Sequence, residues 1–153
     1  MSKLEGSMPT KILFVCAGNT CRSPMAQVIA QDLLASQGLS DVSTRSAGII
    51  AYTGSGASRN AMAVVSRHGL DLSEHRSELL DEGLVAWAAV VIVMEAHHMD
   101  QVVHLGGNDK VITLKEDVPD PFGCNEEAYS EVFNLLRSHI QDILERVILG
   151  TDV

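Results

Sequence analysis

The chain has 153 residues, of which 46% are hydrophobic and 20% are charged, and its formal net charge is -9. This length suits one domain that buries a core without disulfide or metal staples, and the hydrophobic content excludes an intrinsically disordered chain. The negative charge argues against nucleic acid and anionic membranes as partners, because both reward clustered Lys and Arg.

The apolar runs and the cysteine count bear on the cellular compartment in which the protein is expected. The runs ILFV and AAVVIVM are far shorter than the roughly 20 residues of a membrane span. The start MSKLEGS lacks the basic and apolar stretches of a signal peptide, and three cysteines do not make a disulfide framework. We therefore expect a cytoplasmic protein, with residues 1–8 as a flexible leader or cloning remnant and residues 9–153 as a single domain.

The first predicted elements are a strand, a helix and a second strand. Lys11–Cys16 reads KILFVC, an apolar run of strand length. Residues 24 to about 37 are predicted to be helical, because apolar side chains recur at helical spacing and Gly38 supplies a stop. Val42–Gly48 (VSTRSAG) is the second predicted strand.

The rest of the chain continues this alternation. We predict helices at 58–68 and 79–87, a strand at 89–95, a helix at 97–105, a strand at 111–114 and a closing helix at 126–149. The run at 89–95 is apolar and β-branched, as expected of a central parallel strand covered on both faces. This order predicts a doubly wound α/β domain with a parallel sheet of about four strands, which binds ligands beyond the carboxyl ends of its strands.

The segment CAGNTCRSP joins the first strand to the first helix. Gly18 and Asn19 tolerate left-handed backbone, so the loop can turn its N–H groups inward around an anion. Arg22 stands at the helix start, where negative charge is favoured, and its guanidinium can hold two phosphate oxygens. The candidate phosphate-binding residues are Ala17, Gly18, Asn19, Thr20, Cys21, Arg22 and Ser23.

Cys16 stands at the floor of this loop. Helix N-termini and nearby cations lower cysteine pKa values to about 3.5 to 7.5, so we expect the Cys16 pKa to be low enough for a thiolate near neutral pH. A thiolate beside a phosphoryl group predicts covalent phosphoryl transfer to Cys16, with Ser23 stabilising the sulfur as it leaves. The alternative is a buried strand-end cysteine next to an ordinary turn. The spacing of Cys, five residues, Arg and Ser, with Gly and Asn inside, favours catalysis.

VCAGNTCRSP resembles the signature loop of the low-molecular-weight protein tyrosine phosphatase family, and the resemblance extends from about Pro9 to Val147. It implies a phosphotyrosine protein phosphatase I-like fold, with Cys16 as nucleophile, Arg22 as phosphate clamp and a distant aspartate as general acid. It also implies phosphorylated protein substrates, a cognate kinase in the same pathway, and no metal or organic cofactor.

DPFG, which follows the last predicted strand, supplies that aspartate. One carboxyl group can protonate the departing product and then activate water, so Asp120 is the candidate acid and base. Phe122 is expected to form a wall of the entrance. Asp-Pro alone is a common turn, and the family's Asp-Pro-aromatic motif is what favours a catalytic Asp120.

The resemblance assigns weaker roles to three further residues. Ser46 and His75 resemble members of a hydrogen-bond network that, with Asn19 and Ser23, holds the loop open. Ser46 as an ordinary strand-end hydroxyl and His75 as a surface cap remain alternatives. Cys21 resembles a second loop cysteine that captures the oxidised nucleophile as a disulfide, and packing beneath the loop is its other reading.

Thr20 and Phe122 bear on which phosphate is removed. Many tyrosine phosphatases of the family carry an apolar residue at the position of Thr20 and two aromatic residues after Asp-Pro, whereas here Gly123 follows Phe122. The combination of CAGNTCRSPMA, TLKE and DPFG resembles the bacterial protein arginine phosphatases. We therefore favour phosphoarginine over phosphotyrosine as substrate. If the substrate is phosphotyrosine instead, Thr20 is a packing residue and does not select the substrate.

Three rival readings remain. A thioredoxin-coupled arsenate reductase needs relay cysteines, and no cysteine lies between Cys21 and Cys124. A non-catalytic phosphate-binding module would not need the cysteine, arginine and aspartate together. His97, His98 and His104 are close in sequence, but without a Cys or carboxylate at ligand spacing we expect a solvated helix face and no metal site.

Overall fold

Four parallel strands form the centre of the structure, a computed structural model that describes residues 11–39 and 41–148. The strands are β1 (Lys11–Cys16), β2 (Ser43–Gly48), β3 (Val90–Val93) and β4 (Val111–Thr113), in the order β2-β1-β3-β4. The predicted four-stranded parallel α/β fold is confirmed. The expected leader, residues 1–8, lies outside the described residues.

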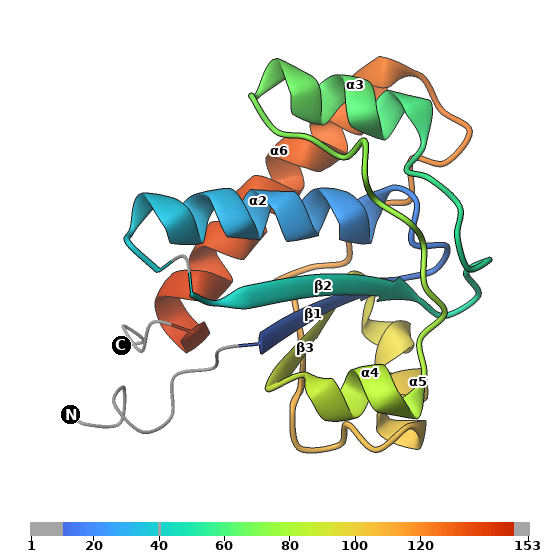
Figure 1. Cartoon of the computed structure of the whole chain (residues 1–153), viewed down its shortest axis with the longest axis vertical. Helices are drawn as coiled ribbons and strands as arrows, with labels where there is room; N and C mark the ends of the chain where they lie inside the picture. Colours follow the sequence, from blue (N-terminus) through green and yellow to red (C-terminus); the bar gives the residue numbers. More distant parts are fainter. Residues whose placement is uncertain (1–10, 40, 149–153) are drawn as a thin grey trace.

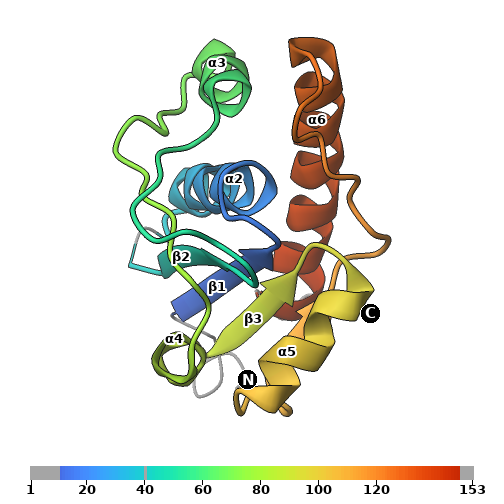
Figure 2. The ribbon, with the colours of Figure 1, turned by 90° about the vertical axis from the view of Figure 1, so that its right-hand side faces the viewer.

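Helices cover both faces of the sheet (Figures 1 and 2). One face carries α2 (Arg22–Ser36) and α6 (Glu126–Ile143), and α3 (Arg59–Arg67) packs against α6 farther from the sheet. The other face carries α4 (Glu82–Trp87) and α5 (Met99–His104). Successive strand residues point to opposite faces: Ile12 and Phe14 of β1 join the first core, and Leu13 and Val15 join the second. Two buried faces explain why β3, and β1 after the exposed Lys11, consist of apolar residues.

Several helices begin or end away from their predicted bounds. α2 begins at Arg22, two residues before the predicted start, and Pro24 lies in its first turn. The predicted helix at 79–87 begins only at Glu82, because Leu79 pairs with Gly48 as an isolated parallel bridge. Asp81 then caps α4 by accepting a hydrogen bond of 2.8 Å from the Leu84 N–H.

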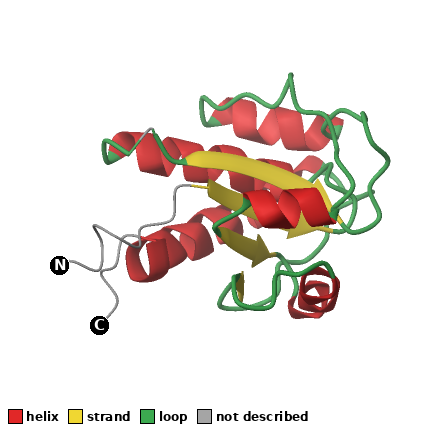
Figure 3. Ribbon diagram, turned by 60° about the horizontal axis from the view of Figure 1, so that its bottom comes forward, coloured by secondary structure: helices red, strands yellow, loops and turns green. Residues whose placement is uncertain are grey.

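The last two predicted helices also differ in detail (Figure 3). A 3-10 turn at Ala96–His98 precedes α5, so the α-helix is shorter than the one predicted at 97–105. α6 ends at Ile143 and continues as a π-helical turn at Leu144–Ile148, while residue 149 lies outside the described part of the chain. Among the described helices, none combines the length and the hydropathy of a membrane span.

Candidate active site

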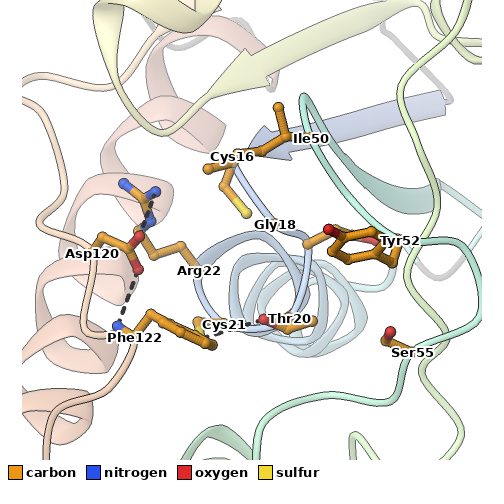
Figure 4. Close-up of a pocket in the computed structure, with 12 residues that line it drawn as sticks. Cys16, Gly18, Thr20, Cys21, Arg22, Ile50, Tyr52, Ser55, Asp120 and Phe122 are labelled. Atoms are coloured by element: carbon orange, nitrogen blue, oxygen red, sulfur yellow. Dashed lines mark hydrogen bonds and ion pairs between the residues drawn. The ribbon is translucent and has the colours of Figure 1, made fainter.

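A pocket of about 460 Å³ opens at the carboxyl end of β1 (Figure 4). Its floor is the loop from Cys16 to Arg22, and its walls come from segments far away in the sequence. The wall residues are Ile50, Tyr52, Ser55, Asp120 and Phe122. The structure therefore brings Cys16, Arg22 and Asp120 to one pocket, at the edge of the sheet where the fold class places ligands.

Asn19 gives the loop its shape. It is fully buried and has a φ of +59°, the left-handed backbone that asparagine tolerates. Its side-chain amide donates to Ser23 Oγ at 2.8 Å and Ser46 Oγ at 2.9 Å, and its Oδ1 accepts from the Glu78 N–H at 2.8 Å. Of the two residues that tolerate left-handed backbone, Asn19 adopts it and Gly18 does not.

His75 supports the loop from outside. Its Nε2 lies 2.7 Å from the carbonyl oxygen of Asn19. Since a carbonyl only accepts, Nε2 carries the proton and donates. Burial lowers the pKa of His75, although the bond to Asn19 opposes this shift, so the imidazole is neutral at neutral pH. The structure thus joins Asn19, Ser23, Ser46 and His75 in one network.

The Cys16 thiol is only 2% exposed and lies at the base of the pocket. Its Sγ is 2.9 Å from Ser23 Oγ. Burial raises the pKa of Cys16 above the ordinary thiol value, and this outweighs the lowering by Ser23, by the charge of Arg22 and by the Asn19 backbone. The expectation of a lowered Cys16 pKa is therefore wrong, because the desolvation of a buried sulfur could not be read from the loop motif.

Replacing Ser23 by alanine is expected to raise the Cys16 pKa further. The substitution removes the hydrogen bond that stabilises the thiolate, so the thiol keeps its proton to higher pH. The measurement is the pH profile of Cys16 alkylation, read by peptide mass analysis. Ser55→Ala, a pocket serine outside the Cys16 contacts, is the control. A Ser23→Ala midpoint at or below that of the wild type would contradict this role.

Arg22 is 1% exposed and is held by groups from two other loops. Its Nη1 donates to Glu95 Oε2 and to the carbonyl oxygen of Val118, the latter at 2.8 Å. Its Nη2 lies 3.6 Å from Asp120 Oδ2. Burial raises the pKa of Glu95, but hydrogen bonds from Arg22 and His97 outweigh it, so the Glu95 pKa lies below its usual value. Glu95 is therefore an anion that fixes the guanidinium.

Asp120 and Phe122 stand on the opposite wall, in the loop that precedes α6 (Figure 4). The Asp120 side chain is 47% exposed, and its Oδ1 accepts a hydrogen bond of 3.1 Å from the Phe122 N–H. Phe122 is largely exposed, as are Ile50 and Tyr52. The carboxylate therefore faces the pocket from a rim of apolar side chains.

Cys21 belongs to the loop that lines the pocket, and its thiol makes polar contacts with residues outside the loop. Its Sγ lies 3.2 Å from the Tyr129 hydroxyl and 3.6 Å from Ser58 Oγ, and burial is the first cause that raises the Tyr129 pKa to about 12. This contact fits the packing reading of Cys21. The described residues that line the pocket do not include Cys124, which is exposed.

The sequence analysis missed the wall residue Ile50 and two residues that hold the loop in place, Glu95 and Gly48. Glu95 ends the apolar run of β3, and a lone charge at the carboxyl end of a buried strand is the signal that could have found it. Gly48 ends β2 so close to the loop that a Cβ there would lie 2.5 Å from the Ala17 carbonyl oxygen. Only glycine therefore fits at that position without displacing the loop.

The histidines after β3 do not form the expected solvated helix face. His97 Nε2 lies 2.9 Å from Glu95 Oε1, and His98 is buried. His104 is exposed at the end of α5. The expectation that no carboxylate stands near these histidines is wrong, because the 3-10 turn at Ala96–His98 folds the chain back on Glu95.

Comparisons with known proteins point to one family. The family model described as "Low molecular weight phosphotyrosine protein phosphatase" matches residues 11–149. A "Protein-arginine-phosphatase" of Geobacillus stearothermophilus is 38% identical over 92% of this chain and 97% of that protein. A "Probable low molecular weight protein-tyrosine-phosphatase EpsP" of Ralstonia nicotianae is 34% identical over 89% of this chain and 94% of its own.

Two solved structures show the same fold. The YwlE arginine phosphatase from Geobacillus stearothermophilus superposes with a TM-score of 0.82 at 36% identity, over 91% of this chain and 93% of that one. A low molecular weight protein tyrosine phosphatase from T. tengcongensis has a TM-score of 0.84 at 35% identity, over 90% and 99% of the two chains. The similar structures thus include one named as an arginine phosphatase and one named as a protein tyrosine phosphatase.

Proposed function

The chain belongs to the low molecular weight phosphotyrosine protein phosphatase family and is a protein phosphatase, and from this premise we propose that it hydrolyses phosphoarginine in proteins through a phosphocysteine at Cys16. Cys16 is the nucleophile, Arg22 holds the phosphoryl oxygens, and Asp120 is the general acid and base. The observation that carries the choice of substrate is the hydroxyl side chain of Thr20, in the loop that lines the pocket.

In the first step the phosphoryl group lies on the loop, with its oxygens toward the Arg22 guanidinium and the loop N–H groups. Cys16 Sγ attacks phosphorus, an S–P bond forms, and the P–N bond to the substrate guanidine breaks. Asp120 donates a proton to the departing nitrogen. The product is a neutral or protonated arginine side chain, and the enzyme holds a phosphocysteine.

The raised pKa of Cys16 fits this step. A thiol together with a dianionic phosphoryl group contains the same total number of protons as a thiolate together with a monoanionic phosphoryl group. The thiol proton can therefore pass to the bound phosphoryl group or the leaving nitrogen as the S–P bond forms. Ser23 Oγ, 2.9 Å from the sulfur, is placed to hydrogen-bond the thiolate.

In the second step water replaces the sulfur. Asp120, now a carboxylate, takes a proton from the attacking water, the S–P bond breaks, and inorganic phosphate forms. The sulfur leaves as a thiolate, which the Ser23 hydroxyl and the Arg22 charge stabilise. This step needs no metal and no redox partner. Asn19, Ser46 and His75 act as positioning residues that keep the loop open for both steps.

Three features support phosphoarginine over phosphotyrosine. The Thr20 hydroxyl suits a polar leaving group better than an apolar branched side chain would. The Asp120 carboxylate, which already lies 3.6 Å from one guanidinium nitrogen, can accept a hydrogen bond from the substrate's guanidinium. After Asp120–Pro121, Phe122 is followed by Gly123 and not by a second aromatic residue, so a phenyl ring would have an aromatic side chain on one side only.

Replacing Thr20 by isoleucine is expected to lower kcat/KM for a phosphoarginine peptide about tenfold or more, and to leave the matched phosphotyrosine peptide equal or better. A pocket that loses a hydrogen-bonding group rejects the substrate that used it. The measurement is phosphate release from the two peptides. Thr53→Ile, an exposed threonine outside this pocket, is the control.

Wild-type preference for phosphotyrosine would overturn the arginine proposal and favour the tyrosine alternative. Equal losses on both peptides in the Thr20→Ile variant would make Thr20 a packing residue.

We propose a cytoplasmic setting and substrates that a cognate kinase phosphorylates. All three cysteines are free thiols, which suits a reducing compartment. Under oxidation, we propose that Cys21 gives up its contact with Tyr129 and forms a disulfide with the oxidised Cys16.

A further inference from the structure

A compact cluster of possible metal ligands lies next to Arg22 and consists of Glu95, His97 and His98. The 3-10 turn after β3 folds the two imidazoles back toward the carboxylate that ends the strand. One donor atom of each residue lies within 4.8 Å of the donor atoms of the other two. A carboxylate with two imidazoles is a ligand set that late first-row divalent cations favour.

His98 supplies an independent reason to expect a ligand. The residue is 4% exposed, and its Nδ1 is buried with no hydrogen-bond partner among the described residues. Buried polar atoms without a partner are rare and costly.

We propose that Glu95, His97 and His98 bind a divalent transition-metal ion such as Zn²⁺, with water completing the tetrahedron. In a tetrahedron, ligand distances of about 2.0 to 2.2 Å place two donor atoms about 3.3 to 3.6 Å apart, so the cluster must contract on binding. His97 can move, because its side chain is 69% exposed. It exchanges its hydrogen bond to Glu95 Oε1 for the metal.

The cation is coupled to catalysis through the two oxygens of Glu95. Oε2 accepts the hydrogen bond from Arg22 Nη1, and Oε1 accepts the one from His97. A cation on Oε1 withdraws negative charge from the ion pair that fixes Arg22, so it weakens the hold on the guanidinium. This part rests on the proposed function: the bound cation lowers the rate of phosphate release.

The binding test uses the full chain with Cys16→Ser and Cys124→Ser, so that the pocket thiol and the exposed thiol cannot bind the metal. Zn²⁺ affinity is measured by competition with a chromophoric chelator. His97→Ala is expected to weaken binding at least about tenfold. His104→Ala, which removes an exposed histidine outside the cluster, is expected to leave it unchanged. Equal affinity in the His97→Ala protein, or no binding at micromolar Zn²⁺, would overturn the site.

The coupling test is a Zn²⁺ titration of phosphatase activity in the chain with all its cysteines. Each variant is normalised to its own rate with a chelator present. His97→Ala is expected to need at least about tenfold more Zn²⁺ for half inhibition than the parent and His104→Ala proteins. Coincident curves would assign inhibition to the Cys16 thiol and overturn the coupling. A chain that binds Zn²⁺ at the cluster but releases no phosphate would refute the proposed function and leave the site standing.

Discussion

A Cys16→Ser variant is expected to lose at least roughly 10⁴-fold in turnover and still bind inorganic phosphate. The serine hydroxyl is a far weaker nucleophile than a thiolate, and a serine oxygen is a poorer leaving group than the cysteine sulfur. Both the attack on phosphorus and the later hydrolysis of the phospho-enzyme are therefore slowed. The phosphate-binding groups are separate from the thiol: Arg22 and the backbone of the loop remain in place.

The measurement combines phosphate release with calorimetric titration of inorganic phosphate. Cys124→Ser is the matched control, because it removes an exposed thiol that lies outside the pocket, and it is expected to keep the wild-type rate. Turnover within tenfold of the wild type in the Cys16→Ser protein would refute a phosphocysteine mechanism.

An Arg22→Lys variant is expected to lose about 10³-fold in kcat/KM although the charge is kept. A lysine ammonium cannot hold Glu95, the Val118 carbonyl and two phosphoryl oxygens at once, as the planar guanidinium can. The position is also buried, so Glu95 loses part of its compensation and the folded state is destabilised.

Kinetics and thermal unfolding together separate the two effects on Arg22. The control is Arg67→Lys, which alters an exposed arginine paired with Glu126 on α6. The loss in kcat/KM of the Arg22→Lys protein is expected even at temperatures where this protein is fully folded. Near-normal kcat/KM in a folded Arg22→Lys protein would show that the fork of the guanidinium is not required.

Local sequence patterns were sufficient for the framework of the site. The runs at β1 and β3 are apolar on both faces, which indicates buried parallel strands. Cys16, Asn19 and Arg22 lie in one contiguous motif, so their proximity follows from the loop itself. Asp120 was predicted from its position after the last strand together with the family's Asp-Pro-aromatic motif, because loops at that edge meet the same ligand.

What escaped prediction depends on contacts between distant segments. Glu95 becomes an anchor only because β3 lies beside β1 and its end meets Arg22. Gly48 is required because β2 ends against the Ala17 carbonyl. The raised pKa of Cys16 comes from the full burial of the sulfur, which depends on the whole core. A single local motif does not predict how deeply a residue is buried or how close it lies to a neighbouring strand.

The most direct test is to stop wild-type turnover of a phosphoarginine peptide with a denaturing quench within the first turnover and to weigh the peptide that contains Cys16. We expect that peptide to carry the added mass of one phosphoryl group, located on the Cys16 sulfur and absent from the Cys16→Ser protein. An unmodified Cys16 throughout turnover, with phosphate released at the normal rate, would contradict the phosphocysteine mechanism.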